Sequence, residues 1–436
     1  MKQAFIEPTT LNRPGTTPAT TKTGELVPTG ATQSEGAAQS ATSHKPGPKG
    51  PGRLLYIDNL RWVMIMLVVS MHAAVTYSHL GSWYYNEDVR ISLAETGIFA
   101  TYQATLQSFF MGFLFFIAGY FVPGAYDAKG TGKFLKDRAF RLGLPLLFFV
   151  FIMQPISVYC IGLFHGENVA PKGFLDLYVR YITKGWWLGG TGPLWFCEAL
   201  LIFCLGYTLF RSLRRKTVVN GTLGKSAPRA TMLPGKARIW GLIALITVLT
   251  FLVRFPWPNG TAFYNLQFCY FSQYVLFFIA GTMAFRGEWL SKFSVATGKY
   301  WGRVALIGGS ICWVAVLTLG GAFKGQLDSY HGGWHWQSLG MAFWETMTGV
   351  AISIYLLVWF REKFNRQRRA ARYFSANAFA VYVFHTPVLI AISRAVSGVQ
   401  GPLLLKFLFL TVISIIVTYA FSSLVFRKLP LLRKIL

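Results

Sequence analysis

From residue 53 onward, the chain alternates long apolar runs with short segments that carry most of the charge. Each run has about 17 to 25 mostly apolar residues, the length an α-helix needs to cross the ~30 Å hydrocarbon core of a bilayer. Helices are expected because a spanning segment must satisfy its backbone hydrogen bonds internally. The predicted fold is an all-α, polytopic transmembrane helical bundle. Its ten spans are expected at 60–79, 100–123, 142–164, 192–210, 239–256, 265–285, 304–322, 338–360, 375–393 and 402–426.

Residues 1–52 follow a different pattern, rich in Thr, Pro, Gly, Ala and Ser and almost free of large apolar side chains. Such a segment has too little apolar surface to offset the entropy lost on ordering, and it lacks the apolar core of a signal peptide. We expect a disordered tail at 1–52, a transmembrane domain at 53–430 and a short basic tail at 431–436. The loops between the spans are too short for a soluble enzymatic domain.

The composition agrees with a membrane protein, because 53% of the residues are hydrophobic and only 13% are charged, whereas soluble domains carry about 25% charged residues. The net charge of +26 would be compatible with binding to nucleic acid, but the distribution of the basic residues between the two sides of the membrane explains it better. With a cytoplasmic N-terminus, 34 of the 42 Lys and Arg residues fall on the inner side and 7 on the outer side. This positive-inside pattern predicts a multi-pass protein of the inner (cell) membrane with both termini cytoplasmic and no nucleic-acid partner. The bilayer is the expected partner of this charge.

The outer loops are rich in aromatic, Gly and His residues, at 81–88, 185–195 and 331–336. Two interpretations remain open: interfacial anchoring by Trp and Tyr, and a rim on which sugar rings stack. His331 and His335 are four residues apart, but a neighbouring Gly pair disfavours a helix there, so no metal is expected. The five cysteines form no CxxC pair, so neither zinc nor a disulfide framework is indicated.

Four ionisable side chains are singled out inside predicted spans, where the cost of burying them indicates a function. They are His72, Glu198, Glu345 and His385. Counted from the predicted span ends, all four lie at a similar depth, at mid-membrane or slightly outward. Together they are expected to form one polar cavity. The alternative for each is an ordinary hydrogen bond between packed helices.

Arg61, Arg138 and Arg141 are expected on the cytoplasmic side of this cavity. Arg61 and His72 are eleven residues apart, almost three helical turns, so they share a face about 16 Å apart along the axis. Asp58 lies one turn before Arg61 and is expected to hold it. Arg138 and Arg141, spaced i, i+3, are expected to meet on one helix face. Two neighbouring arginines can bind a phosphate group through several hydrogen bonds. The alternative interpretation is that both are ordinary charges of the positive-inside pattern.

The order of these motifs resembles the acyltransferase 3 family of integral membrane acyltransferases. The segment YIDNLRWVMIMLVVSMH holds the paired Arg61 and His72 of that family, and Arg138 and Arg141 match its second basic motif. The resemblance covers residues 53–430 and is strongest to the branch that modifies periplasmic glucans. Other similar blocks are FFMGFLFFIAGYF (109–121), KFLKDRAFRLGLPLLF (133–148), GPLWF (192–196) and ANAFAVYVFHTPV (376–388).

The resemblance implies an O-acyltransferase that uses acyl-CoA as its donor substrate. Members move an acyl group, usually acetyl and in some cases succinyl, from cytoplasmic acyl-CoA to a hydroxyl of an extracytoplasmic sugar or glycan. On this chain, the donor-binding residues are expected to be Arg61, Arg138 and Arg141, with Asp58 holding Arg61. No resident cofactor or metal is expected.

We expect His72 to carry the chemistry, because neutral imidazole accepts a hydroxyl proton near pH 7. A covalent acyl-His72 intermediate is the alternative route. Glu345 or Glu198 is expected to orient the imidazole, by the logic of a base and its orienting partner. His385 completes the catalytic set. These last three residues rest on membrane energetics and not on the family motif.

A different class of protein also fits ten spans with buried His and Glu. A proton-coupled secondary transporter of a small polar solute places such groups along its pathway. Carriers often show two halves with related hydropathy, and no convincing internal repeat is visible here. Binding of CoA distinguishes the two, because a carrier does not need it.

Overall fold

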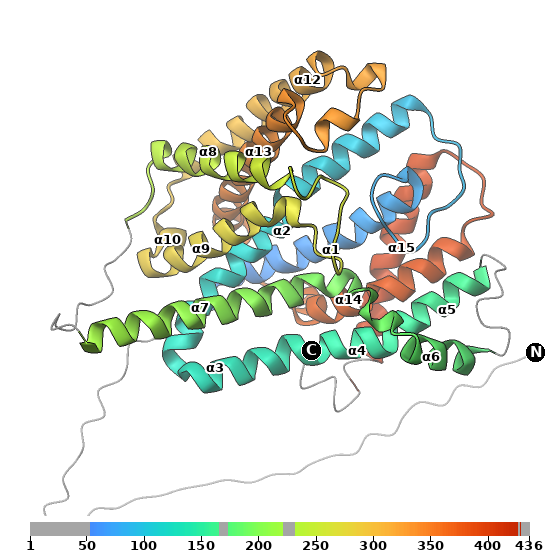
Figure 1. Cartoon of the computed structure of the whole chain (residues 1–436), viewed down its shortest axis with the longest axis horizontal. Helices are drawn as coiled ribbons and strands as arrows, with labels where there is room; N and C mark the ends of the chain where they lie inside the picture. The colour runs from blue at the N-terminus through green and yellow to red at the C-terminus, as the bar shows by residue number, and fades with distance from the viewer. Residues whose placement is uncertain (1–52, 165–172, 221–231, 426–427, 429–436) are drawn as a thin grey trace, which may run out of the picture. The chain divides into compact units, whose positions relative to one another are not determined.

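The computed structural model describes residues 53–164, 173–220, 232–425 and 428, whose helices are arranged as in Figure 1. Among these residues, ten helical segments are long and apolar enough to cross a membrane. The predicted all-α, polytopic fold is therefore confirmed. The tails predicted at 1–52 and 431–436 lie outside the described residues.

The α-helices are α1 Leu55–Ser78, α2 Leu93–Lys129, α3 Thr131–Arg138, α4 Leu144–Phe148, α5 Gln154–Phe164, α6 Phe174–Thr183, α7 Trp195–Asn220, α8 Lys236–Val253, α9 Phe271–Gly287, α10 Trp289–Lys292, α11 Val295–Arg303, α12 Gly309–Leu319, α13 Trp336–Lys363, α14 Arg369–Ala395 and α15 Leu403–Leu424. Three π-helical turns continue them, namely η1 Ala139–Gly143, η2 Phe149–Met153 and η6 Val304–Gly308. The 3-10 turns are η3 Trp186–Gly189, η4 Gly192–Leu194, η5 Phe268–Tyr270, η7 Ala322–Lys324 and η8 Asp328–Tyr330.

Three spans extend well beyond the apolar runs that predicted them. The third runs over Thr131–Gly162 and the seventh over Val295–Lys324, because the charged segments before residues 142 and 304 continue the same helical rods. Helix α2 has 37 residues, about 56 Å at 1.5 Å per residue, far more than the ~30 Å hydrocarbon core. It begins with a capping box, in which Ser92 and Glu95 exchange hydrogen bonds. Helix α2 is therefore longer than the membrane core is thick.

Helices α2 and α9 pack backbone to backbone at the centre of the bundle. A Cβ on Gly119 would collide with the carbonyl oxygen of Phe278, and one on Gly281 with that of Phe116. Small residues allow such close approach between membrane helices, where dispersion contacts replace the hydrophobic effect as the driving force. Only glycine fits at these two positions.

Helix α1 lies inside the bundle and packs against α2, α13, α14 and α15 (Figure 1). Its Leu60, Val69 and Ala73 are completely buried. The polar positions of α1 are therefore surrounded by protein on several sides. This arrangement gives the residues of the first span partners from helices more than 300 positions away in sequence.

Candidate active site

The structure brings His72 of α1 and His385 of α14 into direct contact. Nδ1 of His72 lies 3.1 Å from Nε2 of His385, and the two rings are nearly parallel, with their centroids 5.1 Å apart. Nδ1 of His385 lies 2.7 Å from the backbone carbonyl oxygen of Tyr382. Two of the four side chains expected to share a cavity therefore meet.

The hydrogen bonds of this pair assign its protons. The Tyr382 carbonyl only accepts, so Nδ1 of His385 carries a proton. In neutral imidazole the other nitrogen is then an acceptor, so Nδ1 of His72 donates to Nε2 of His385. Nε2 of His72 is left as an unprotonated acceptor, with no partner in the part of the chain that the structure describes. The arrangement orients one basic nitrogen.

The indole of Trp83 covers the imidazole of His72 from the loop after α1. The two rings stack at 4.0 Å between centroids, with 12° between their planes. The indole Nε1–H of Trp83 is buried and has no acceptor among the described residues. A hydrogen-bond donor without a partner therefore lies beside the histidine pair.

Contacts on both sides hold the loop that carries Trp83. The Glu87 amide donates to the carbonyl of Thr76, 2.9 Å away, and Nε2 of His79 lies 2.7 Å from the carbonyl oxygen of Glu87. The Glu87 carboxylate forms a buried ion pair with Lys406 of α15. These contacts connect the loop to α1 and α15 and keep the indole over His72.

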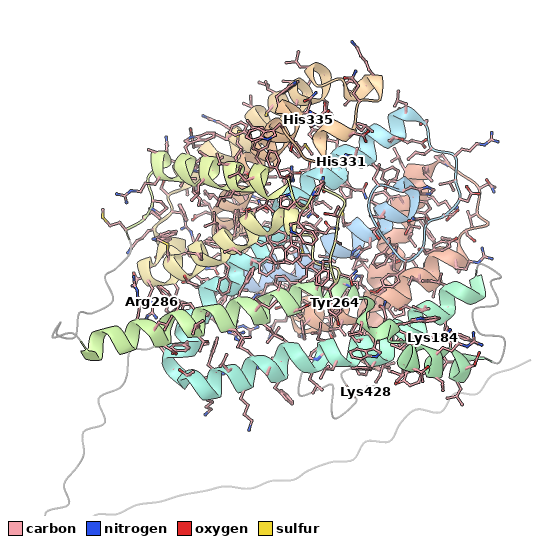
Figure 2. All side chains as sticks on the ribbon, viewed as in Figure 1. Lys184, Tyr264, Arg286, His331, His335 and Lys428 are labelled. Carbon is pink, nitrogen blue, oxygen red and sulfur yellow. The ribbon has the colours of Figure 1, made fainter. Side chains whose placement is uncertain are left out.

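Glu198 does not join the histidine pair. Its carboxylate accepts a hydrogen bond from the Thr191 hydroxyl at 3.0 Å, immediately before its own helix α7. Burial and the nearby Glu198 carboxylate raise the pKa of the Tyr264 phenol, which places the acid close to the loop after α8 (Figure 2). Within the described chain, Glu198 has no hydrogen bond to His72 or His385.

Glu345 has a different partner from the one expected. Its Oε2 lies 2.5 Å from Nη2 of Arg254, and the Arg254 side chain is 0% exposed. Nε and Nη1 of Arg254 have no acceptor among the described residues. The charge of the guanidinium is therefore balanced by the Glu345 carboxylate. The hydrogen-bond partner of His72 is His385, and Glu345 neutralises a buried arginine.

A second group of basic residues lies along α1 and α3, at the end of α1 remote from His72. Oδ1 of Asp58 lies 3.3 Å from Nη1 of Arg61, as expected, and Oδ2 lies 2.7 Å from Nε of Arg53. The Arg61 guanidinium stacks over the ring of Phe121 at 4.7 Å. Arg138 of α3 carries a second positive charge whose electrostatic influence reaches Arg61.

Arg138 and Arg141 are less well aligned than the i, i+3 spacing predicted. Arg138 ends α3, whereas Arg141 lies in the π-helical turn η1, whose wider turn rotates the later side chain away from the earlier one. Arg138 lies over the ring of Phe134 at 5.2 Å. The Arg141 side chain is 63% exposed, and its Nε lies 3.7 Å from Asp137. Arg138 is the less exposed of the two side chains.

His331 and His335 precede α13 and do not share a helix (Figure 2). His331 follows η8, and His335 is the residue before Trp336, where α13 begins. Among the described residues, no group of three or more His, Cys, Asp or Glu side chains is arranged to hold a metal ion.

Two residues of this region were not singled out from the sequence. Arg254 falls inside the run predicted at 239–256, so the rule that flagged the other buried ionisable groups would have identified it. Trp83 is one of several aromatic residues at 81–88, and nothing in that segment distinguishes it from an interfacial anchor. Its stacking on His72 becomes visible only in the folded chain.

Comparison with known proteins identifies the family of this chain. The family model described as an acyltransferase domain, of the acyltransferase 3 type, matches residues 54–423. Glucans biosynthesis protein C of Salmonella schwarzengrund (strain CVM19633) is 24% identical over 273 residues, covering 61% of this chain and 66% of the relative. Its counterpart in Escherichia coli (strain K12) is 24% identical over 235 residues, covering 53% and 58%.

The matched part is thus slightly under two thirds of the length of these relatives. No solved structure matches the chain. The family model nevertheless covers nearly all of the described helices, from the start of α1 almost to the end of α15. It includes His72 with its partner His385, and Arg61 with Arg138. This multi-pass integral membrane protein belongs to the acyltransferase 3 family.

Proposed function

We propose that the protein is a membrane-embedded O-acyltransferase, which moves an acetyl or succinyl group from cytoplasmic acyl-CoA to a hydroxyl of an extracytoplasmic sugar or glycan. The observation that carries the proposal is the hydrogen-bonded chain from Tyr382 through His385 to His72. It leaves one basic nitrogen free beside a covering indole. A positioned base with an orienting partner is what acyl transfer to a hydroxyl requires.

In the proposed reaction, Nε2 of His72 removes the proton from the acceptor hydroxyl as its oxygen attacks the thioester carbonyl. The tetrahedral intermediate then expels the CoA sulfur, which takes the proton from His72. The products are the O-acyl sugar and CoA thiol, and His72 is again neutral. The unpaired Nε1–H of Trp83 is a candidate donor for the negative charge that develops on the carbonyl oxygen. His385 is a positioning residue in this scheme.

The donor is proposed to bind along α1. Arg61 and Arg138, with Asp58 holding Arg61, would bind the CoA phosphates at the cytoplasmic end. His72 lies eleven residues further along the same helix, about 16 Å away. The thin pantetheine arm of CoA suits this offset. Arg141 contributes weaker, solvent-screened attraction from its exposed position.

The proposed acceptor is taken from the names of the relatives, and the proposed orientation in the membrane from the distribution of charge. The relatives are called glucans biosynthesis protein C, so we propose a glucan as the first acceptor to test. The positive-inside pattern supports cytoplasmic termini and an inner-membrane location. A proton-coupled carrier remains the alternative class, and family membership favours the enzyme over it.

The donor site can be tested in inside-out membrane vesicles that enclose a glucan acceptor and are supplied on the outside with radiolabelled acetyl-CoA or succinyl-CoA. We expect transfer of label to the glucan, and a KM for acyl-CoA raised roughly tenfold or more by Arg138→Gln, because one charge-assisted phosphate contact is worth about 1.5–3 kcal/mol. Arg141→Gln, at the exposed end of the same segment, is expected to raise KM less. An unchanged KM in Arg138→Gln would remove that residue from the donor site. No label transfer and no CoA binding by the wild-type protein would favour the carrier.

The positioning role of His385 predicts a fall in turnover without a loss of donor binding. His385→Ala removes the acceptor that orients His72, and we expect kcat to fall about tenfold to hundredfold with KM for acyl-CoA unchanged, since a buried hydrogen bond of this kind is worth about 1–3 kcal/mol. His385→Gln keeps an acceptor oxygen and is expected to recover part of the lost kcat. Equal kcat in wild type and His385→Ala would show that His72 needs no such partner.

A further inference from the structure

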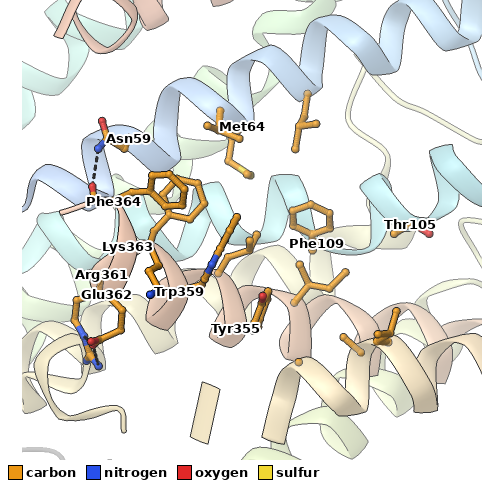
Figure 3. Close-up of a pocket in the computed structure, with 18 of the residues that line it drawn as sticks. Asn59, Met64, Thr105, Phe109, Tyr355, Trp359, Arg361, Glu362, Lys363 and Phe364 are labelled. Atoms are coloured by element: carbon orange, nitrogen blue, oxygen red, sulfur yellow. Dashed lines mark hydrogen bonds and ion pairs between the residues drawn. The ribbon is translucent and has the colours of Figure 1, made fainter. Parts of the chain in front are cut away.

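A large cavity among the described helices lies away from the histidine pair. It is a groove of about 1790 Å³, lined by residues of α1, α2, α11, α12 and α13 and by the start of α14. Pockets for small ligands usually measure about 300–1,000 Å³, so this groove is large for a sugar or a small acid. Figure 3 shows Asn59 and Met64 on one side of it and Tyr355 and Trp359 on the other.

The groove and the proposed donor path use largely different faces of α1. Successive residues of an α-helix are rotated by about 100°, so Asn59, Val63 and Leu67, which line the groove, point about 120–160° away from Arg61. Trp62 and Met64, which also line it, lie about 100° and 60° from Arg61. His72 lies on the Arg61 face. Most of the α1 lining of the groove is therefore turned away from the proposed donor path.

The walls of the groove are apolar over most of the membrane depth. On α13 they run from Trp344 to Trp359, fifteen residues or about 22 Å. Phe109 of α2 and Trp313 of α12 contribute further aromatic surface. Within a bilayer, hydrocarbon chains are the natural occupants of such a surface.

One end of the groove is strongly cationic. Five exposed basic residues line it without an ion pair in the described chain: Lys299, Arg303, Lys363, Arg366 and Arg368. The one acidic residue of the lining, Glu362, is paired with Arg361 at 2.9 Å. The positive-inside pattern assigns this end to the cytoplasm. The lining therefore combines long apolar walls with a cluster of unpaired positive charges at the level of lipid headgroups.

The connection between α13 and α14, which carries part of this charge, is held in place by α1. The side-chain amide of Asn59 donates to the carbonyls of Phe364 and Arg366 at 2.7 and 3.0 Å (Figure 3). Asn59 itself is buried. The basic end of the groove is thus built on an ordered connection and not on a free loop.

We propose that this groove is a binding site for one anionic diacyl phospholipid of the cytoplasmic leaflet. Its acyl chains lie along the walls formed by α2, α12 and α13, and its phosphate is bound by the basic residues at the mouth. Charge complementarity selects an anionic over a zwitterionic headgroup. The apolar walls distinguish this ligand from CoA, whose pantetheine arm is polar. The site is independent of the proposed transfer reaction.

Native mass spectrometry of the full chain in detergent can measure this binding with phosphatidylglycerol and phosphatidylcholine as probes. We expect wild type to retain one phosphatidylglycerol molecule and to bind it more tightly than phosphatidylcholine. Lys363→Gln/Arg366→Gln is expected to weaken phosphatidylglycerol binding by roughly thirtyfold, the factor for two basic residues at about 1 kcal/mol each. The control Lys133→Gln/Lys136→Gln removes the same charge from exposed positions of α3 and is expected to have no such effect.

The position of the acyl chains can be mapped with phosphatidylglycerol that carries a diazirine on its chains. We expect labelled peptides from α12 and α13, and less labelling in Ile352→Trp, which fills the groove, than in Ile311→Trp, which adds the same bulk at a position 66% exposed. Saturating CoA is expected to leave labelling unchanged. Equal affinity for both lipids, labelling outside the groove, or displacement by CoA would overturn the proposal.

Discussion

Substitution of His72 by alanine is expected to lower kcat for acyl transfer by roughly 10²–10⁴-fold, the usual contribution of a positioned general base. Its imidazole has a free, unprotonated nitrogen that a partner, His385, orients. Labelled acyl transfer to a glucan in vesicles measures the effect. We expect KM for acyl-CoA to change little, because the phosphates are proposed to bind about 16 Å away.

The matched control is His335→Ala, which removes an exposed histidine outside the proposed site and is expected to keep wild-type turnover. Activity of His72→Ala close to wild type would remove the imidazole from the mechanism. The kinetic pattern distinguishes the two roles that the sequence left open. A base acting in direct transfer predicts sequential kinetics, whereas a covalent acyl-His72 intermediate predicts ping-pong kinetics and label on the protein before acceptor is added.

Breaking the Arg254–Glu345 pair is expected to have the largest effect on stability. Glu345→Gln leaves the completely buried guanidinium of Arg254 without its counter-charge, and such losses cost about 3–5 kcal/mol of the free energy of unfolding. Arg254→Met leaves the carboxylate unpaired and is expected to destabilise similarly. Replacing both residues with methionine is expected to recover most of the loss, because it removes both buried charges. Thermal unfolding of the purified protein in detergent measures all three variants.

The same variants separate a structural carboxylate from a catalytic one. If Glu345 only neutralises Arg254, the double methionine variant is expected to keep turnover at a temperature where it stays folded. Loss of turnover in a folded, stable double variant would return Glu345 to the reaction, in the orienting role that the sequence favoured. Stability of Glu345→Gln equal to wild type would show that the ion pair contributes nothing to the fold.

The sequence by itself determined the features that depend on local composition. Ten apolar runs predicted ten membrane-spanning helices, because length and hydropathy suffice when every backbone hydrogen bond must be made within the segment. The spacing of Asp58 and Arg61 predicted their contact on one helix turn. The order of short motifs indicated the family that the comparisons then confirmed.

The tertiary structure alone decided which distant residues became partners. His72 and His385 are 313 positions apart, and membrane energetics flagged both without indicating that they bind each other. Glu345 was flagged by the same argument, yet its partner is Arg254. A buried charge is costly wherever it lies, so the sequence reveals that it needs a partner. Which partner it finds depends on how the helices pack, and helix packing in a membrane is set by shape, as at Gly119 and Gly281.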